Sequence, residues 1–238
     1  MVRLGVVMRK FLIPFAFLAA SISTGACAED WTGLYIGGHG GWSDWSFARP
    51  DDPTSPTQEI DGAFGGAQIG YDYQFPNNFI IGAVADVSAG DLSGPTYKDG
   101  NFITVNSDID AFGTLRGRLG YSFGHSLLYA TAGAAWMKGS TTENCPAGAG
   151  AGHCFTTGAY SETADIDVSG YAYGGGLEVK VSDHISLFAE YLRLDFGTET
   201  VDPGPKSNPR QEEIEDIDVV RAGVNFRFGE PEKRVSLK

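Results

Sequence analysis

The chain has 238 residues, 33 of them glycine, and only 20% of its residues are charged. Its formal net charge is −13 and it has no lysine-rich or arginine-rich stretch, which excludes nucleic acid as an expected partner because phosphate contacts need a basic surface. The length allows one sizeable domain or two small ones.

Residues 1–28 have the features of a cleavable secretory signal peptide. Positive charges lie ahead of an apolar run at residues 11–20, and a small-residue cleavage motif, Ala26-Cys27-Ala28, follows. The apolar run is too short to cross a bilayer as a helix. We therefore expect the signal to be cut between Ala28 and Glu29.

Two alternatives concern this segment. A lipoprotein signal would place lipid on Cys27, but Thr24 stands where such signals usually carry leucine, and we favour the ordinary secretory signal. Translation starts either at Met1 or at Met8, because Met8-Arg9-Lys10 already supplies a charged beginning.

Residues 29–228 have no apolar stretch long enough for a membrane helix. Instead, apolar and polar side chains alternate with a period of two, which is typical of β-strands with two different faces. In residues 67–75, for example, Ile69, Tyr71 and Tyr73 share one face and Gln68, Asp72 and Gln74 share the other. Strands are expected over residues 32–46, 67–75, 79–88, 114–123, 127–141, 171–181, 185–191 and 220–228.

The connections between these eight strands alternate in length. Short turns are expected at residues 76–78, 124–126 and 182–184, and long loops at residues 48–60, 94–105, 143–163 and 202–212. An even strand number with short periplasmic turns and long external loops is typical of an outer-membrane barrel. A soluble β-sandwich also alternates, but it explains neither the loop lengths nor the export signal.

Aromatic residues are placed as two membrane interfaces require. Phe75, Phe79, Phe123, Phe226 and Phe228 lie beside the expected short turns, whereas Trp42, Trp45 and Trp136 lie toward the long loops. Aromatic girdles mark both edges of a barrel's apolar band. The sequence thus predicts an all-β, eight-stranded antiparallel transmembrane up-and-down β-barrel in a Gram-negative outer membrane, with both termini in the periplasm.

Charged side chains of both signs lie on the strand faces opposite the apolar ones. They are Asp72, Asp86, Glu178, Glu190, Arg116, Arg118, Lys180, Arg221 and Arg227. An eight-stranded barrel is only wide enough inside for its own side chains, so we expect a network of paired charges that fills the lumen. An active site or an ion path is the alternative reading of the same residues.

No catalytic residue, cofactor or metal site is expected. There is no Gly-x-Ser-x-Gly motif, and sequence logic places none of the four histidines beside a serine or aspartate partner. The glycine-rich segment Gly37–Gly41 lacks the Lys-Ser/Thr of a phosphate loop. We read these glycines as relief of crowding in a strand.

Two cysteines, Cys145 and Cys154, remain after the signal is removed. In an exported protein, two nearby cysteines favour a disulfide. A zinc site is the alternative, but it needs further ligands and only His153 is close.

Several motifs of the chain resemble one family. They are Trp31–Gly38 with Gly40-Gly41, Gly65–Tyr71, Gly113–Tyr121, Ala189–Tyr191 and Val219–Phe228. They are similar to the small outer-membrane β-barrel proteins of alphaproteobacteria, a porin-like, OmpA-type group with major surface antigens and hemin-binding proteins. Such barrels generally end at the last aromatic residue, which the barrel-assembly machinery recognises, whereas here a polar tail at residues 229–238 follows Phe228.

Three functions are compatible with these features of the sequence. The first is a structural surface protein that contacts outer-membrane lipid and lipopolysaccharide and presents four external loops. The second is a small pore for ions or solutes, against which the narrow bore argues. The third is binding of hemin or a host ligand by the loops, which the resemblance implies, with His153 and Tyr160 as candidate contacts.

Overall fold

The computed structural model describes residues 29–48, 58–93, 97–99, 103–146, 158–201, 210–214 and 217–228. The predicted signal peptide and the tail at residues 229–238 lie outside them. The described elements are β1 (Gly33–Ala48), β2 (Gln58–Gln74), β3 (Phe79–Ser93), β4 (Tyr97–Asp99), β5 (Ile103–Phe123), β6 (Ser126–Cys145), β7 (Tyr160–Lys180), β8 (Ile185–Asp195), β9 (Gly197–Val201), β10 (Arg210–Ile214) and β11 (Ile217–Phe228). Within these ranges, no helix is long and apolar enough to cross a membrane.

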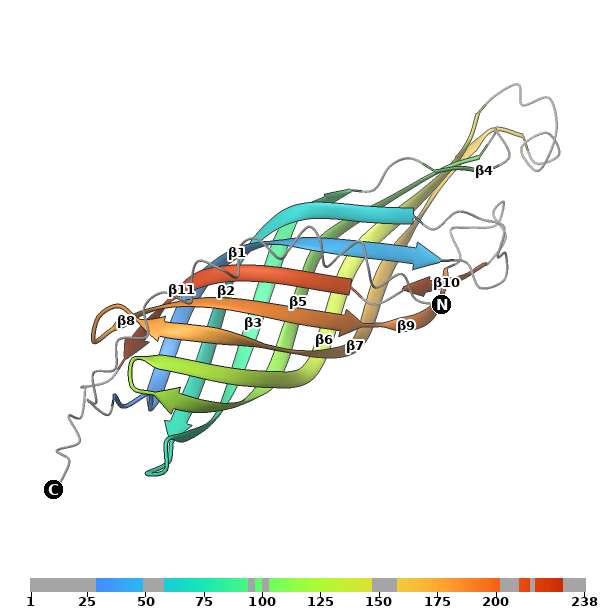
Figure 1. The fold of residues 1–238 in the computed structure, drawn as a ribbon. Coiled ribbons are helices and arrows are strands. Elements are labelled where there is room, and N and C mark those ends of the chain that lie inside the picture. Colours follow the sequence, from blue (N-terminus) through green and yellow to red (C-terminus); the bar gives the residue numbers. More distant parts are fainter. Residues whose placement is uncertain are drawn as a thin grey trace, which may run out of the picture.

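Eight of these strands form a closed antiparallel ring (Figure 1). The order is β11-β8-β7-β6-β5-β3-β2-β1, and β1 pairs with β11 from Leu34↔Phe228 to Asp44↔Asp218 to close it. Closure gives every strand two neighbours, so that backbone groups facing hydrocarbon are hydrogen-bonded. The predicted eight-stranded up-and-down barrel is confirmed.

The three short turns lie at one end of the barrel, together with the start of β1 and the end of β11. At the first turn, Asn78 adopts a left-handed φ of 66° and its N–H donates to the Phe75 carbonyl at 3.0 Å. Gly124 in the second turn has φ 72°. Asparagine and glycine are the residues that accept this conformation at least cost.

At the opposite end, the strands are longer than the sequence indicates. β6 runs to Cys145 and β7 begins at Tyr160, both inside the predicted loop at residues 143–163. β5 begins at Ile103 and β2 at Gln58. β9 and β10 form a hairpin that pairs with the end of β1 through β10. A strand outside the membrane needs no apolar outward face. In β7 the exposed Asp165 and Asp167 alternate with Ala164 and Ile166, a pattern that the sequence analysis did not assign to a strand.

The excess length forms a structure that we call the projection: residues 103–110 of β5, 138–145 of β6 and 160–170 of β7. About 9–11 residues suffice for a tilted strand to span a bilayer, whereas β5 and β7 each have 21. In Figure 1 these strands continue, with β4, well beyond the remaining strands of the ring.

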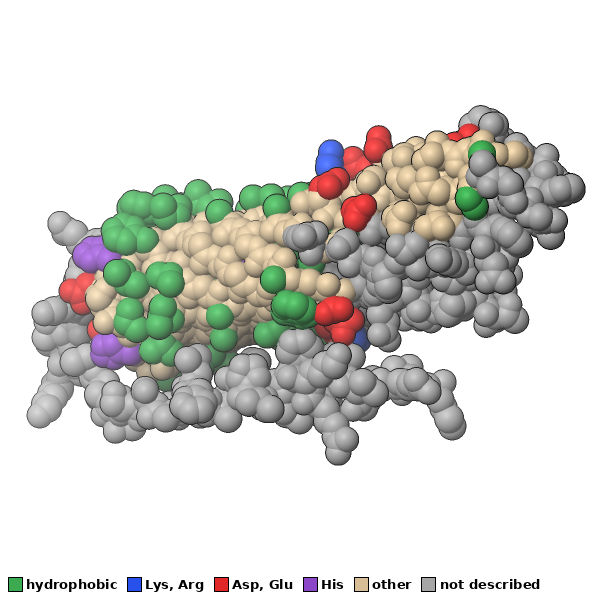
Figure 2. Space-filling view, turned by 90° about the horizontal axis from the view of Figure 1, so that it is seen from above, with side chains coloured by type: hydrophobic (Ala, Val, Ile, Leu, Met, Phe, Trp, Pro, Cys, Tyr) green, Lys and Arg blue, Asp and Glu red, His purple; other side chains and the backbone are tan. Residues whose placement is uncertain are grey.

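The outer wall of the barrel is a belt of exposed apolar side chains. It includes Leu34, Ile36, Ile69, Tyr71, Ile81, Leu115, Leu119, Leu128, Tyr173, Leu187 and Val224. Figure 2 shows this belt, with acidic side chains gathered where the wall passes into the projection. A contiguous apolar surface of this extent is incompatible with water and fits contact with lipid.

Aromatic rings border the belt at the short-turn end. Phe79 packs on Tyr121 with ring centroids 5.3 Å apart, and Phe226 packs on Phe228 at 5.0 Å. Trp42 and Trp136 are exposed toward the opposite end. These positions agree with the two predicted girdles.

Two glycines on neighbouring strands offer a sharp test of how closely the wall is packed. A Cβ added at Gly133, which faces inward, would overlap the Leu115 carbonyl oxygen and lie 2.6 Å from Cα of Arg116. At Gly117, which faces outward, the nearest atom would be the Ala132 oxygen at 3.8 Å. Only the first position has no room for a methyl group.

We expect Gly133→Ala to lower the free energy of unfolding by about 1–3 kcal/mol, because strands β5 and β6 must separate to admit the methyl group. Gly117→Ala is the matched control and should leave stability unchanged or raise it by about 0.4–1 kcal/mol. Urea unfolding of the refolded barrels measures both, and equal midpoints for the two variants would contradict this packing.

Candidate functional site

The interior of the barrel contains four charged residues that pair across its width, which we call the upper quartet. Arg116 contacts Asp86 at 2.9 Å and Glu190 at 3.0 Å, and Arg221 contacts Asp86 at 3.0 Å and Glu190 at 2.6 Å. Thr114 donates a further hydrogen bond to Asp86. Each guanidinium therefore bridges both carboxylates, and strands β3, β5, β8 and β11 are tied together.

A second group of four, the lower quartet, repeats this arrangement nearer the short turns. Arg118 contacts Asp72 at 3.2 Å and Glu178 at 2.5 Å, and Arg227 contacts them at 2.9 and 3.0 Å. The strands involved are β2, β5, β7 and β11. Both quartets are buried and contain two positive and two negative groups, so that each is neutral as a unit.

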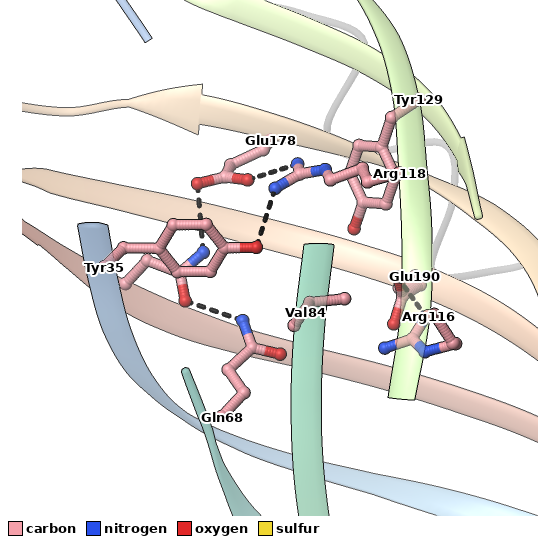
Figure 3. Close-up of a pocket in the computed structure, with 9 residues that line it drawn as sticks. Tyr35, Gln68, Val84, Arg116, Arg118, Tyr129, Glu178 and Glu190 are labelled. Atoms are coloured by element: carbon pink, nitrogen blue, oxygen red, sulfur yellow. Dashed lines mark hydrogen bonds and ion pairs between the residues drawn. The ribbon is translucent and has the colours of Figure 1, made fainter. Parts of the chain in front are cut away.

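Neutral polar side chains complete the bonding of the lower quartet. Glu178 accepts hydrogen bonds from Ser186 at 2.6 Å and Asn225 at 2.9 Å, and Asn225 in turn accepts one from Gln68 at 2.7 Å. The Arg118 guanidinium, which points toward Glu178, donates to the Tyr35 hydroxyl at 3.3 Å (Figure 3). These ligands hold the carboxylate in place without adding charge.

The space between the two quartets is almost filled. A cavity of about 10 Å³ remains, lined by side chains that include Tyr35, Gln68, Arg116 and Glu190. A single water molecule needs about 10–15 Å³ of such space. The described side chains therefore leave room for about one water molecule between the quartets.

Lys180, the ninth predicted lumen charge, belongs to neither quartet. Its Nζ lies 3.3 Å from Glu29 and donates to the Asp30 carbonyl at 2.5 Å. Glu29 also lies 3.3 Å from His125 in the second short turn. Lys180 therefore holds the segment that follows the predicted cleavage site at the mouth of the barrel.

Trp31 closes this mouth. Its side chain is 0% exposed and packs with Ile80, Leu127 and Tyr129. Its indole Nε1–H donates to the Gly124 carbonyl at 3.1 Å, and the Arg227 guanidinium lies 4.8 Å from the ring centroid. Because Trp31 precedes the first strand, alternation could not indicate which way it points, and its role was missed.

The part of the interior beyond the upper quartet is mostly apolar, with a few buried polar side chains such as Ser43 and Thr141. A buried cluster there contains Phe64, Leu92, Ile109, Phe112, Ala135, Met137, Val168, Ala172, Leu192, Leu194, Phe196, Ile217 and Val219. The sequence reading expected a charged filling and did not predict this apolar cluster. A signal exists, because continuing by twos from inward Glu190 reaches Leu192 and Leu194, and from Arg221 reaches Val219 and Ile217.

His39 departs from the sequence reading, which placed no histidine beside a serine. His39 Nε2 lies 2.9 Å from Ser88 Oγ, between the upper quartet and the apolar cluster. The Arg221 guanidinium lies 3.4 Å from the same nitrogen, and the Phe64 ring packs edge-on against the imidazole. Both members of the pair are buried, and charged or apolar layers separate them from either end.

The loop candidates are only partly described. The Tyr160 hydroxyl donates to Glu143 Oε1 at 2.5 Å, so this phenol is already engaged. His153 and Cys154 lie outside the described residues, and the Cys145–Cys154 disulfide stays a prediction, although Cys145 is buried at the end of β6. Among the residues that the structure describes, no group of three histidine, cysteine or acidic side chains is arranged to hold a metal ion.

Comparison with known proteins agrees with this architecture. The family model described as outer membrane protein beta-barrel domain matches residues 13–228. The chain belongs to this family. Its relatives are named as outer-membrane proteins. The family and these relatives place the protein in the outer membrane of a Gram-negative bacterium.

Two relatives are similar to most of the chain. The 31 kDa outer-membrane immunogenic protein of Brucella melitensis is 29% identical over 90% of this chain and 89% of its own length. The 22 kDa outer membrane protein of Rhizobium leguminosarum is 26% identical over 84% of this chain and 80% of its own length. Among solved structures, the Pseudomonas aeruginosa outer membrane protein OprG aligns with a TM-score of 0.47 and 13% identity, over 85% of this chain and 99% of OprG.

Proposed function

We propose that this protein is a closed, non-conducting surface barrel that holds its projection outside the cell. The observation that carries the proposal is the filled interior, with Trp31 at one end, two cross-paired quartets in the middle and an apolar cluster at the other end. The barrel acts as a rigid membrane anchor, and the strands that extend beyond it meet the environment.

The charge pairing argues against a pore more strongly than the barrel's width does. An ion path through the quartets would require a guanidinium to leave both of its carboxylates at once. Breaking a buried ion pair costs on the order of 3–5 kcal/mol because a charge is left uncompensated. In each quartet four contacts join the same four groups, so that no single rearrangement opens a way through.

Surface display is supported by the length of β5, β6 and β7 beyond the belt. The Brucella relative is named as an immunogenic protein of the outer membrane, a property that fits strands and loops held outside the cell. The belt would contact outer-membrane lipid, with lipopolysaccharide at the end toward the projection, after insertion by the barrel-assembly machinery.

Neither catalysis nor hemin binding is part of the proposal. The His39–Ser88 pair is enclosed between the upper quartet and the apolar cluster, where no substrate reaches it. Tyr160, the described hemin candidate, is bonded to Glu143. No contact among the described residues favours binding of hemin over binding of a partner protein to the exposed strands.

Single-channel recording on refolded protein tests the closed interior. We expect silent bilayers at moderate voltage from protein whose closed barrel is verified by different migration of unheated and boiled samples. Arg116→Ala/Arg221→Ala, which removes both cations of the upper quartet, serves as a comparison for leakage through a damaged interior. Regular current steps from the unaltered, verified barrel would overturn the proposal and favour a small pore.

A further inference from the structure

One edge of the projection is not hydrogen-bonded to any described strand, although β9 comes close to β7. β7 pairs with β6 along its whole length, from Tyr160↔Cys145 to Val179↔Ser126. On its other side, β7 pairs with β8 only from Tyr171↔Asp195 to Lys180↔Ser186. Among the described strands, none is hydrogen-bonded to residues 163–169 on the side away from β6.

The local geometry explains why β8 leaves β7 at this point. β8 ends at Asp195, and Gly197 follows with a left-handed φ of 73°. The Gly197 N–H donates to Asp195 Oδ1 at 3.1 Å, which stabilises the change of direction. The chain then enters β9, which pairs with β10, and the upper part of β7 becomes an edge.

The side chains along this edge have two distinct faces. Thr163, Asp165 and Asp167 are exposed on one face, and Ala164 and Ile166 are half-buried on the other. Asp167 pairs with Lys138 of β6 at 3.3 Å, with both side chains about two-thirds exposed at 69% and 66%. In its cross-strand row, Asp165 lies beside Ser140 of β6 and, beyond it, Asp108 of β5, so that no positive side chain faces it there.

An edge strand of this kind is a template for another strand. Its outward N–H and C=O groups can pair with an extended peptide, and side chains directly opposite lie about 4.5–5.5 Å apart on the same face. A second copy of this chain would place acidic residues against acidic residues, which is destabilising. A peptide with positive side chains at every second position would instead face Asp165 and Asp167.

We propose that residues 163–169 of β7 bind an extended peptide segment of a partner protein by strand addition. The segment carries lysine or arginine at alternate positions, opposite the aspartates, and β-branched apolar residues between them, beside Ala164 and Ile166. This inference deepens the proposed function, on which it rests, because it names the partner that the displayed strands recognise.

The test uses the full chain in lipid nanodiscs and a synthetic nonapeptide of alternating lysine and valine. We expect saturable binding, and slower amide hydrogen exchange for residues 163–169 than for the same residues without peptide. A peptide of the same sequence that is fully N-methylated keeps the charge but cannot form a ladder, and it should not bind. Equal binding of the two peptides would overturn strand addition.

Two matched charge-reversal variants distinguish binding of the peptide at the β7 edge from its general electrostatic attraction to an acidic protein. Asp165→Lys/Asp167→Lys should weaken binding by about tenfold or more, because like charges then face each other. Asp108→Lys/Asp110→Lys makes the same change in net charge on β5, away from the edge, and should leave affinity within about threefold. Equal losses in both variants would overturn the assignment to β7.

Other outcomes are also decisive. Without peptide, native mass spectrometry could detect a dimer, and hydrogen exchange could show protection of residues 163–169. Both results together would show that the partner of this edge is a second copy of the chain and would overturn the peptide proposal. Absence of peptide binding in silent barrels would overturn this inference alone. Conducting barrels would overturn the proposed function, whatever the peptide does.

Discussion

Glu178→Ala is expected to be among the most destabilising single substitutions in this protein. It leaves Arg118 and Arg227 sharing only Asp72 and removes the acceptor for Ser186 and Asn225. Loss of one partner from a buried ion pair costs about 3–5 kcal/mol. Urea titration of the barrel in lipid vesicles, followed by electrophoretic mobility, measures the change in unfolding free energy.

A double-mutant cycle shows whether the quartet acts as a unit. Glu178→Gln keeps most of the shape but removes the charge, and Arg227→Gln alone removes the opposite charge. Combined, they restore neutrality to the lower quartet, so we expect the double variant to be more stable than the sum of the single losses by about 0.5–3 kcal/mol. Additive losses would show that the quartet is not coupled.

Exposed Asp183 in the third short turn provides the control for loss of a carboxylate. Asp183→Ala removes a negative charge at the same end of the barrel without disturbing an interior contact, and it should change stability by no more than about 0.5 kcal/mol. If Asp183→Ala lowered the free energy of unfolding as much as Glu178→Ala does, the effect would come from the change in net charge and not from the quartet.

Trp31→Ala is expected to have an effect of similar size at the mouth of the barrel. The substitution empties a fully buried site beside Ile80 and Leu127 and removes the ring beneath Arg227. Replacing a buried large aromatic side chain by alanine costs about 3–5 kcal/mol through lost burial and the cavity left behind. The denaturant midpoint should fall, while the slope of the transition stays the same.

Two variants separate the closing role of Trp31 from the generic loss of an indole. Trp42→Ala removes a tryptophan that is 44% exposed on the belt, and it should cost less than Trp31→Ala. Trp31→Phe keeps an aromatic ring but loses the hydrogen bond to the Gly124 carbonyl, and it should retain most of the stability, with a loss of about 1 kcal/mol. If Trp31→Ala were no worse than Trp42→Ala, Trp31 would not close the barrel.

These predictions distinguish two parts of the molecule, the ring that anchors it in the membrane and the projection that is displayed outside. The quartets and Trp31 lie within the ring, whereas residues 163–169 of β7 belong to the projection, where Val168 joins the apolar cluster and Asp165 and Asp167 are exposed. Charge reversals at Asp165 and Asp167 should therefore change peptide binding without changing the unfolding midpoint, since both side chains are exposed.

Much of the ring could be predicted from the sequence because the membrane imposes a simple rule on it. Side chains such as Leu115 and Leu119 must face hydrocarbon, and those between them, Arg116 and Arg118, must then face inward. Strand number, antiparallel order and the inward position of all the quartet residues follow from this alternation.

Tertiary structure alone decided which charges pair and where the ordered strands end. Arg116 and Arg118 are two residues apart in one strand, yet they enter different quartets, because the stagger between strands sets which carboxylates lie at each level. Alternation also does not show where Trp31, which lies outside a strand, points. Nor does it show that residues 163–169 have no hydrogen-bonded neighbour among the described strands on the side away from β6. The alternation of side chains along a strand reflects the surroundings of each face, which are lipid on one side and the barrel interior on the other. Contacts between distant segments depend on the register between strands and on closure of the ring, and the sequence of one strand does not determine either.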